Sequence, residues 1–238
     1  MMRALHMGRC VLVAVCWAIA ITPAVVCAQA PIPDTIGQRL VACSACHGKE
    51  GVANGSEYFP RIAGKPAGYL YNQLQNFREG RRSNATMASF VSNMTDTYLM
   101  EIATYYASLD LPYAEASAAP VESQVLARGQ TLVERGDSSI GVPACVRCHG
   151  EALTGTMPSI PGLVGLQKEY LLAQLGGWRT GQRRAAAPDC MRQISEHLSV
   201  ADLGAVASYL SRQPVPRLQK AVDNVRLPLP LECGSGPK

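Results

Sequence analysis

The amino-acid sequence predicts an all-α protein made of two tandem, similar domains joined by a short linker. Three observations predict this fold: a residue pattern that occurs twice, apolar residues at helical spacing, and no sustained alternation of apolar and polar residues. Domains of about 80 to 90 residues are large enough to bury a small helical core. We place the first domain at 31–110, the linker at 111–123, the second domain at 124–213 and a proline-rich tail at 214–238.

The N-terminal segment differs from the rest of the chain. Arg3 and Arg9 make the start basic, an apolar run occupies 11–26, and small residues surround Ala28. This order is typical of a secretory signal peptide, which we place at 1–28 and expect to be cleaved. A retained membrane anchor is the alternative, but the run is shorter than the roughly 20 residues that span a bilayer. The sequence therefore predicts export from the cytoplasm.

The charge balance gives no indication of nucleic-acid binding. The chain has 22 Lys and Arg against 18 Asp and Glu, a formal net charge of +4, and two of the basic residues lie in the predicted signal peptide. Proteins that bind nucleic acid carry clustered basic faces. We therefore expect no nucleic-acid partner.

A repeat organises the remaining chain. Its two copies begin with the motifs Cys43-Ser-Ala-Cys46-His47 and Cys145-Val-Arg-Cys148-His149, which lie 102 positions apart. Downstream, a Tyr-Leu-x-x-Gln-Leu segment that starts at Tyr69 recurs at Tyr170, at an offset of 101. The offset then grows to 104, which indicates an insertion near 185–187. A match of this length predicts that one domain occurs twice.

Three segments show apolar residues at helical spacing, and we predict helices at 68–79, 96–109 and 199–210. Thr95 and Ser199 precede the second and third helices, where a hydroxyl can cap the helix N-terminus. The apolar face of the second helix is predicted to consist of Leu99, Ile102, Ala103 and Tyr106.

The repeated Cys-x-x-Cys-His motif is a signature of covalent haem c attachment. Two thiols three positions apart can bond to one edge of the porphyrin, and the adjacent histidine then lies over the ring and binds iron. The sequence predicts two covalently bound haem c groups. The thioether bonds are predicted at Cys43, Cys46, Cys145 and Cys148, and the proximal iron ligands are predicted to be His47 and His149.

Two other interpretations of the motif are weaker. A redox-active dithiol of the thioredoxin type would need a surrounding βαβ pattern, which the sequence lacks. A zinc site made of four cysteines would leave the following histidine unexplained in both copies.

The sixth iron ligands are predicted from the repeat. Met87 and Met191 correspond to each other at the offset of 104, and a soft thioether sulfur suits haem iron in electron carriers. We therefore predict Met87 and Met191 as distal ligands. His197 corresponds to Asn93, so we expect a solvent-facing helix residue. Three methionines have no methionine at the corresponding position: Met94, Met100 and Met157.

Pro60 and Pro161 follow the two motifs at places where a backbone carbonyl is expected to orient the proximal histidine. Arg78 and Arg179 also recur, and either contact with haem propionates or ion pairing on the helix surface explains them.

Two further cysteines, Cys190 and Cys233, lie outside the motifs. An exported protein meets an oxidising compartment, so we predict a disulfide between them that pins the tail near the second haem site.

These motifs resemble the two-haem cytochrome c4 family, a duplication of the class I cytochrome c fold. The resemblance covers roughly Gly37 to Gln213 and rests on both attachment motifs, the repeated helix motif and the two methionine segments. It implies two tandem class I cytochrome c domains in a periplasmic protein that is soluble or loosely membrane-associated. It further implies electron transfer toward a terminal oxidase, such as one of the cbb3 type.

Histidine and methionine together would leave neither iron with an open position, which favours electron transfer over catalysis. We therefore expect a one-electron carrier and not an enzyme. Its expected donor is a quinol-oxidising complex or a periplasmic dehydrogenase. Two alternatives remain, namely a haem-containing oxidoreductase and a fixed cytochrome subunit of a periplasmic dehydrogenase complex.

Overall fold

The computed structural model describes residues 33–53, 58–113, 120–217, 220–223 and 228–236. The predicted signal peptide, 1–28, lies outside the described residues. Contacts divide the chain into Met1–Pro33 and Asp34–Lys238, and every helix and strand named below belongs to the second unit. In the part of the chain that the structure describes, no helix has both the length and the apolar composition needed to cross a membrane.

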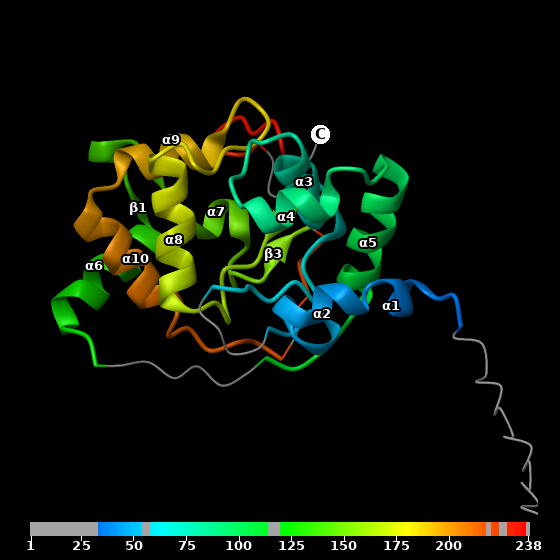
Figure 1. Cartoon of the computed structure of the whole chain (residues 1–238). Coiled ribbons are helices and arrows are strands. Elements are labelled where there is room, and N and C mark those ends of the chain that lie inside the picture. The colour runs from blue at the N-terminus through cyan, green and yellow to red at the C-terminus, as the bar shows by residue number, and fades with distance from the viewer. Residues whose placement is uncertain (1–32, 54–57, 114–119, 218–219, 224–227, 237–238) are drawn as a thin grey trace, which may run out of the picture. The chain divides into compact units, whose positions relative to one another are not determined.

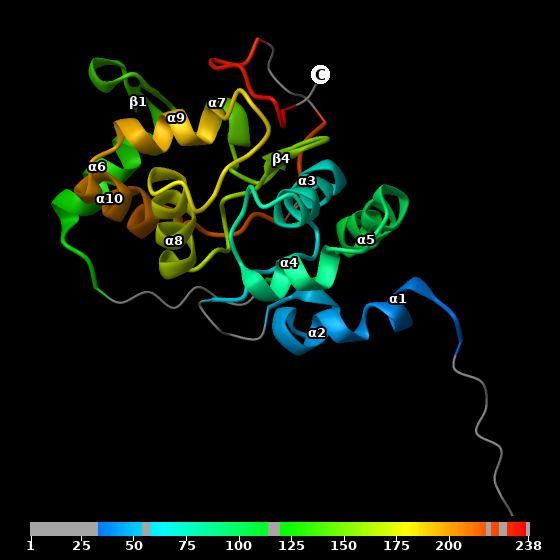
Figure 2. The same ribbon diagram turned by 45° about the horizontal axis from the view of Figure 1, so that its top comes forward.

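The first copy of the repeat is helical. Its elements are α1 (Ile36–Arg39), α2 (Val41–His47), the 3-10 turn η1 (Lys49–Gly51), α3 (Ala67–Arg78), α4 (Ala85–Val91) and α5 (Asp96–Ser108). Helices α3 and α5 lie side by side in Figures 1 and 2. One apolar cluster contains Leu40, Leu70, Ile102, Ala103 and Tyr106, and a second contains Phe77, Val91 and Leu99.

The second copy has corresponding helices. They are α6 (Ser123–Glu134), α7 (Val146–His149), α8 (Lys168–Arg179), α9 (Cys190–His197) and α10 (Val200–Leu210). Helix α10 packs on both α6 and α8, and the three are gathered on one side in Figure 1. The core between them includes Leu132, Val133, Leu171, Leu175, Leu203, Val206 and Leu210. The mostly helical structure confirms the predicted fold class.

Four two-residue strands were not predicted. Strands β1 (Gly136–Asp137) and β2 (Val142–Pro143) pair around the 3-10 turn η2 (Ser138–Ile140), and β3 (Gly155–Thr156) pairs with β4 (Ile160–Pro161). Strands this short cannot show the alternation by which sequence patterns reveal strands.

The predicted helices correspond to α3, α5 and α10, whose described bounds differ from the prediction by one residue at each shifted end. The Thr95 side chain accepts a hydrogen bond from the backbone N–H of Tyr98, and the Ser199 side chain accepts one from Asp202. The predicted caps are therefore confirmed, as is the buried face of α5.

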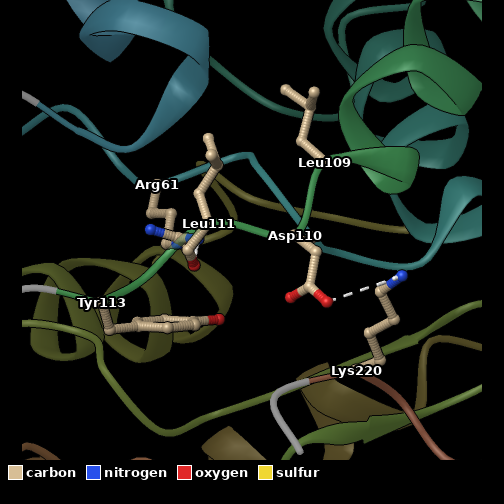
Figure 3. Close-up of a pocket in the computed structure, with 7 residues that line it drawn as sticks. Arg61, Leu109, Asp110, Leu111, Tyr113 and Lys220 are labelled. Atoms are coloured by element: carbon tan, nitrogen blue, oxygen red, sulfur yellow. Dashed lines mark hydrogen bonds and ion pairs between the residues drawn. The ribbon is translucent and has the colours of Figure 1, made fainter.

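The start of the predicted linker is held in place by Arg61. The Arg61 guanidinium donates to the carbonyls of Leu111 at 2.6 Å and Pro112 at 2.9 Å, and it lies 3.9 Å from the ring centroid of Tyr113. Figure 3 shows this stacking. The tail reaches the same region, because Lys220 pairs with Asp110 at 3.8 Å.

The predicted disulfide between Cys190 and Cys233 is present, with Cα atoms 5.1 Å apart. It joins the start of α9 to the tail. The structure does not test the proposed ends of the two domains, the linker and the tail, and these remain predictions.

The contact between α6 and α10 depends on Gly129. A Cβ atom at this position would lie 2.8 Å from Cβ of Tyr209 and would overlap the carbonyl of Ala205. We predict that Gly129→Ala destabilises the second copy by about 1–3 kcal/mol because it overpacks this crossing.

The matched control is Gly204→Ala, in α10 itself, where a Cβ would have no heavy atom within 4 Å. That substitution should stabilise the helix by about 0.5–1 kcal/mol. Urea denaturation measures both changes, and equal stability of the two variants would contradict the packing described for Gly129.

Candidate haem sites

The histidine of each attachment motif is buried and is the last residue of a short helix. Helix α2 ends at His47 and α7 ends at His149, whose exposed fractions are 9% and 7%. The Nδ1 atom of His47 lies 2.9 Å from the carbonyl oxygen of Pro60, and that of His149 lies 2.7 Å from the carbonyl oxygen of Pro161. The predicted carbonyl partners are thus confirmed.

These two hydrogen bonds fix the histidine tautomer. A carbonyl oxygen can only accept, so Nδ1 must carry the proton and Nε2 keeps a free lone pair. Burial lowers the pKa of both His47 and His149. Both rings are therefore held neutral and oriented, which is the form that binds a metal ion.

Three of the four motif thiols have raised pKa values, unlike redox-active cysteines. All four are free, and burial raises the pKa of Cys43 and Cys148 and raises that of Cys145 to about 12. Redox-active cysteines need a lowered pKa. Among the described residues, no three His, Cys, Asp or Glu side chains are grouped as metal ligands.

The two predicted methionine ligands lie at the start of corresponding helices. Met87 is in the first turn of α4, where its N–H donates to Asn84 at 2.9 Å, and Met191 is in the first turn of α9. Both side chains are partly buried against the apolar core of their own copy.

The other candidate iron ligands are Met94, Met100 and His197, and of the two methionines Met94 packs into the core whereas Met100 does not. Met94 packs against both apolar clusters of the first copy, and Met100 has an exposed fraction of 41%. His197 and its counterpart Asn93 are both exposed.

The two recurring arginines Arg78 and Arg179 bind the protein itself. Arg78 donates to Asp96 at 2.5 Å and to the carbonyl of Met94 at 2.8 Å. Arg179 donates to the carbonyl of Leu198. The sequence left two explanations open, contact with haem propionates or ion pairing on the helix surface. The structure shows the ion pair for Arg78.

A different arginine pair lies where the two copies meet. Arg82 donates to Gln73 at 3.0 Å and to Gln174 at 2.7 Å, while Arg183 donates to the same two side chains at 3.1 Å and 2.7 Å. The backbones of Arg82 and Arg183 also form an antiparallel bridge. This interface network, consisting of Arg82, Arg183, Gln73 and Gln174, is symmetric under the repeat. Sequence reasoning missed it, although Arg82 and Arg183 match at the offset of 101.

The interface is rich in donors that have no acidic partner. Arg183 and Lys65 have exposed fractions of only 6% and 5%, and neither they nor Arg82 form an ion pair within the described ranges. The buried Nε1 atom of Trp178 also has no hydrogen-bond partner there. Buried cations are normally paired, so this site suits a group that carries carboxylates.

Comparison with known proteins identifies the family. A family model described as "Cytochrome C oxidase, cbb3-type, subunit III" matches residues 35–105. The thiosulfate dehydrogenase electron acceptor of Thiomonas intermedia is 34% identical over 183 residues, which are 77% of this chain and 83% of the relative. Cytochrome c4 of Pseudomonas aeruginosa is 30% identical over 174 residues, which are 72% of this chain and 84% of the relative. The chain belongs to the cytochrome c4 family.

Solved structures agree with the membership in the cytochrome c4 family. Reduced cytochrome c4 from Pseudomonas stutzeri matches with a TM-score of 0.63 and 27% identity, over 75% of this chain and 96% of that one. The "as isolated" form of thiosulfate dehydrogenase from Marichromatium purpuratum matches with a TM-score of 0.64 and 34% identity. That match covers 72% of this cytochrome but only 36% of the longer chain.

Membership in the cytochrome c4 family implies haem c, and the residues present fit this group. Each motif offers a neutral histidine with a free Nε2 atom beside two free thiols. Haem also carries two propionate carboxylates, and the cations and the Trp178 N–H at the interface are donors without an acidic partner.

The interface network of this cytochrome joins side chains of both copies, so breaking it should weaken the coupling between the copies. Replacement of Arg183 by Met removes the hydrogen bonds to Gln73 and Gln174 and should lower stability by about 2 kcal/mol. We also expect the two copies to unfold in separate calorimetric transitions.

The control is Arg184→Met, because Arg184 is an exposed neighbour with the same charge whose guanidinium makes a single long contact with the first copy, 3.5 Å to the carbonyl oxygen of Gly80. Calorimetry should give that variant the unfolding profile of the unsubstituted protein. If both variants unfold alike, the interface network does not couple the copies.

Proposed function

We propose that this protein is a periplasmic one-electron carrier with two covalently bound haem c groups. In this proposal the thioether bonds form at Cys43, Cys46, Cys145 and Cys148, the proximal iron ligands are His47 and His149, and the distal ligands are Met87 and Met191. The observation that carries the proposal is the duplicated motif in which a buried, neutral histidine points its Nδ1–H at a carbonyl. Haem iron, when bound, supplies the one-electron oxidation and reduction.

The protein residues hold the redox centres and keep other molecules out. The carbonyls of Pro60 and Pro161 orient the proximal rings and increase the electron density on Nε2. Met87 and Met191 would close the sixth positions of bound haem iron, which would favour electron transfer over chemistry on a bound substrate. Bound haem would bring carboxylates, and the buried cations of the interface would be suited to neutralise them.

We propose a periplasmic dehydrogenase as the electron donor and a terminal oxidase, such as the cbb3 type, as the acceptor. The dehydrogenase is supported by two relatives, from Thiomonas intermedia and Stutzerimonas stutzeri, which are 34% and 36% identical and are both thiosulfate dehydrogenase electron acceptors. A quinol-oxidising complex is the other candidate donor. Docking is expected to be small and short-lived, as is usual for redox encounters, and loose association with the membrane would bring the carrier near an oxidase.

The methionine ligands are tested by substitution. Met87→Ala and Met191→Ala should each remove the methionine–iron charge-transfer band from one haem and leave the other unchanged, since each iron has its own sulfur. Absorbance during a stepwise redox titration measures this loss. A band of full strength in both variants would exclude the assignment. Rapid carbon monoxide binding by the unsubstituted reduced protein would instead favour a haem-containing oxidoreductase.

The donor is tested with purified thiosulfate dehydrogenase. Together with thiosulfate, that enzyme should reduce both haems of this protein within its own turnover time, and omission of thiosulfate is the control. The rate should fall as salt rises if charged surfaces steer the encounter. No reduction would direct attention to a quinol-oxidising complex, and stable co-purification with a catalytic subunit would favour a fixed subunit of a dehydrogenase complex.

A further inference from the structure

Three features of the second copy are absent from the first, and the structure brings them together. They are the alanine insertion at 185–187, Cys190 and the tail. The disulfide joins Cys190 to Cys233, and the next tail residue, Gly234, donates its N–H to the carbonyl of Pro188 at 2.9 Å. Figure 2 shows the red tail beside the yellow segment that leads into α9. Three sequence elements that the first copy lacks thus form one contact.

The tail approaches the alanine insertion so closely that only glycine fits there. A Cβ atom at Gly234 would lie 2.6 Å from the carbonyl oxygen of Ala186 and would also overlap Ala187. The insertion is therefore the surface that receives the tail. Because three residues, 188–190, separate the insertion from Met191, the tail packs on the segment that leads to this methionine.

A second anchor attaches the tail near the cysteine motif. Val222 donates its N–H to the carbonyl of Gly155 at 3.1 Å and accepts from the N–H of Met157 at 2.9 Å. Between these two residues, the Thr156 hydroxyl donates to the carbonyl of Cys148 at 2.7 Å. The tail is thus tied both to the motif that carries His149 and to the helix that carries Met191.

Among the described residues, the first copy has no disulfide next to Met87. The residue before Met87 is Thr86, at the position that Cys190 occupies before Met191. The start of α4 is held by the Asn84 cap, whose side-chain amide donates to Tyr58 at 2.7 Å. The contacts at the start of α4 are therefore hydrogen bonds, and one of them involves Tyr58, whose exposed fraction is 67%. The four described cysteines other than Cys190 and Cys233 are free.

We propose that the Cys190–Cys233 disulfide is a clamp that positions Met191 and makes the second haem site harder to open than the first. The inference rests on the proposed function, in which Met191 is the distal ligand. Movement of the first turn of α9, which carries Met191, would have to move the disulfide and the tail residues 228–236 with it. The first turn of α4, which carries Met87, is held by the hydrogen bonds of the Asn84 cap and by no disulfide.

The experiment compares the oxidised holoprotein with the double variant Cys190→Thr/Cys233→Ser, in which threonine copies the residue before Met87. Imidazole is titrated as a small ligand that replaces methionine, and the methionine–iron band of each haem reports the displacement. We expect the unsubstituted protein to bind imidazole more tightly at the first haem. In the double variant, affinity at the second haem should rise at least tenfold and affinity at the first should stay within twofold.

Hydrogen exchange gives a readout that does not depend on iron chemistry. Amides at 185–198 should exchange at least tenfold faster in the double variant, whereas amides at 84–94, the corresponding segment, should be unchanged. Gly234→Ala, which keeps both cysteines but pushes the tail from the insertion, should change both readouts in the same direction. Lys220→Gln is the control, because it breaks only the Asp110 ion pair of the tail.

The outcomes separate the clamp from the proposed function. Intact mass before titration shows whether two haems are attached, and a missing haem at the second motif would overturn both. Two attached haems with unchanged imidazole affinity and unchanged exchange would overturn the clamp alone. An equal effect of Lys220→Gln would also overturn it, because the tail as a whole and not the disulfide would then hold Met191.

Discussion

The hydrogen bond from each motif histidine to a proline carbonyl is the constraint on which both candidate haem sites depend. It links His47 to Pro60 and His149 to Pro161. The bond holds the proton on Nδ1, and burial of the ring keeps the imidazole neutral, so that Nε2 is the one ring atom left to bind iron. In each copy the short helix, α2 or α7, supplies the histidine donor. The chain that follows it supplies the proline carbonyl, and the two meet in a buried place. A similar pair of contacts in both copies explains why the repeat preserves the motif and the following proline together.

The interface between the copies is also symmetric under the repeat. Arg82 and Arg183 each donate to the glutamines of both copies, so neither half of the network is complete in one copy alone. Buried arginines without a carboxylate are costly in a protein interior. The cost is offset if haem carboxylates enter the same place, which links assembly of the two copies to loading of the cofactor. The two similar domains are thereby joined through side chains of both copies.

The sequence predicted what local patterns and the repeat can specify. The Thr95 and Ser199 caps follow from local hydrogen-bonding rules, and the disulfide follows from two cysteines left over in an exported chain. The interface network could not be predicted, because it depends on which surfaces the copies turn toward each other. Arg78 and Arg179 recur as plainly as Arg82 and Arg183 do, yet Arg78 pairs with Asp96 within its own copy and Arg179 binds the carbonyl of Leu198. The two-residue strands were missed for a different reason, since their backbone pairing leaves no pattern in so few side chains.

The proposed function requires two covalently attached haems in the exported chain. Intact-protein mass spectrometry of the purified, exported protein tests this most directly, with peptide mapping to locate the attached groups. The account predicts a mass that exceeds the processed chain by two haem groups, with one on the peptide that contains Cys43 and Cys46 and one on the peptide that contains Cys145 and Cys148. A mass with one haem or none, or free thiols at either motif, would contradict it.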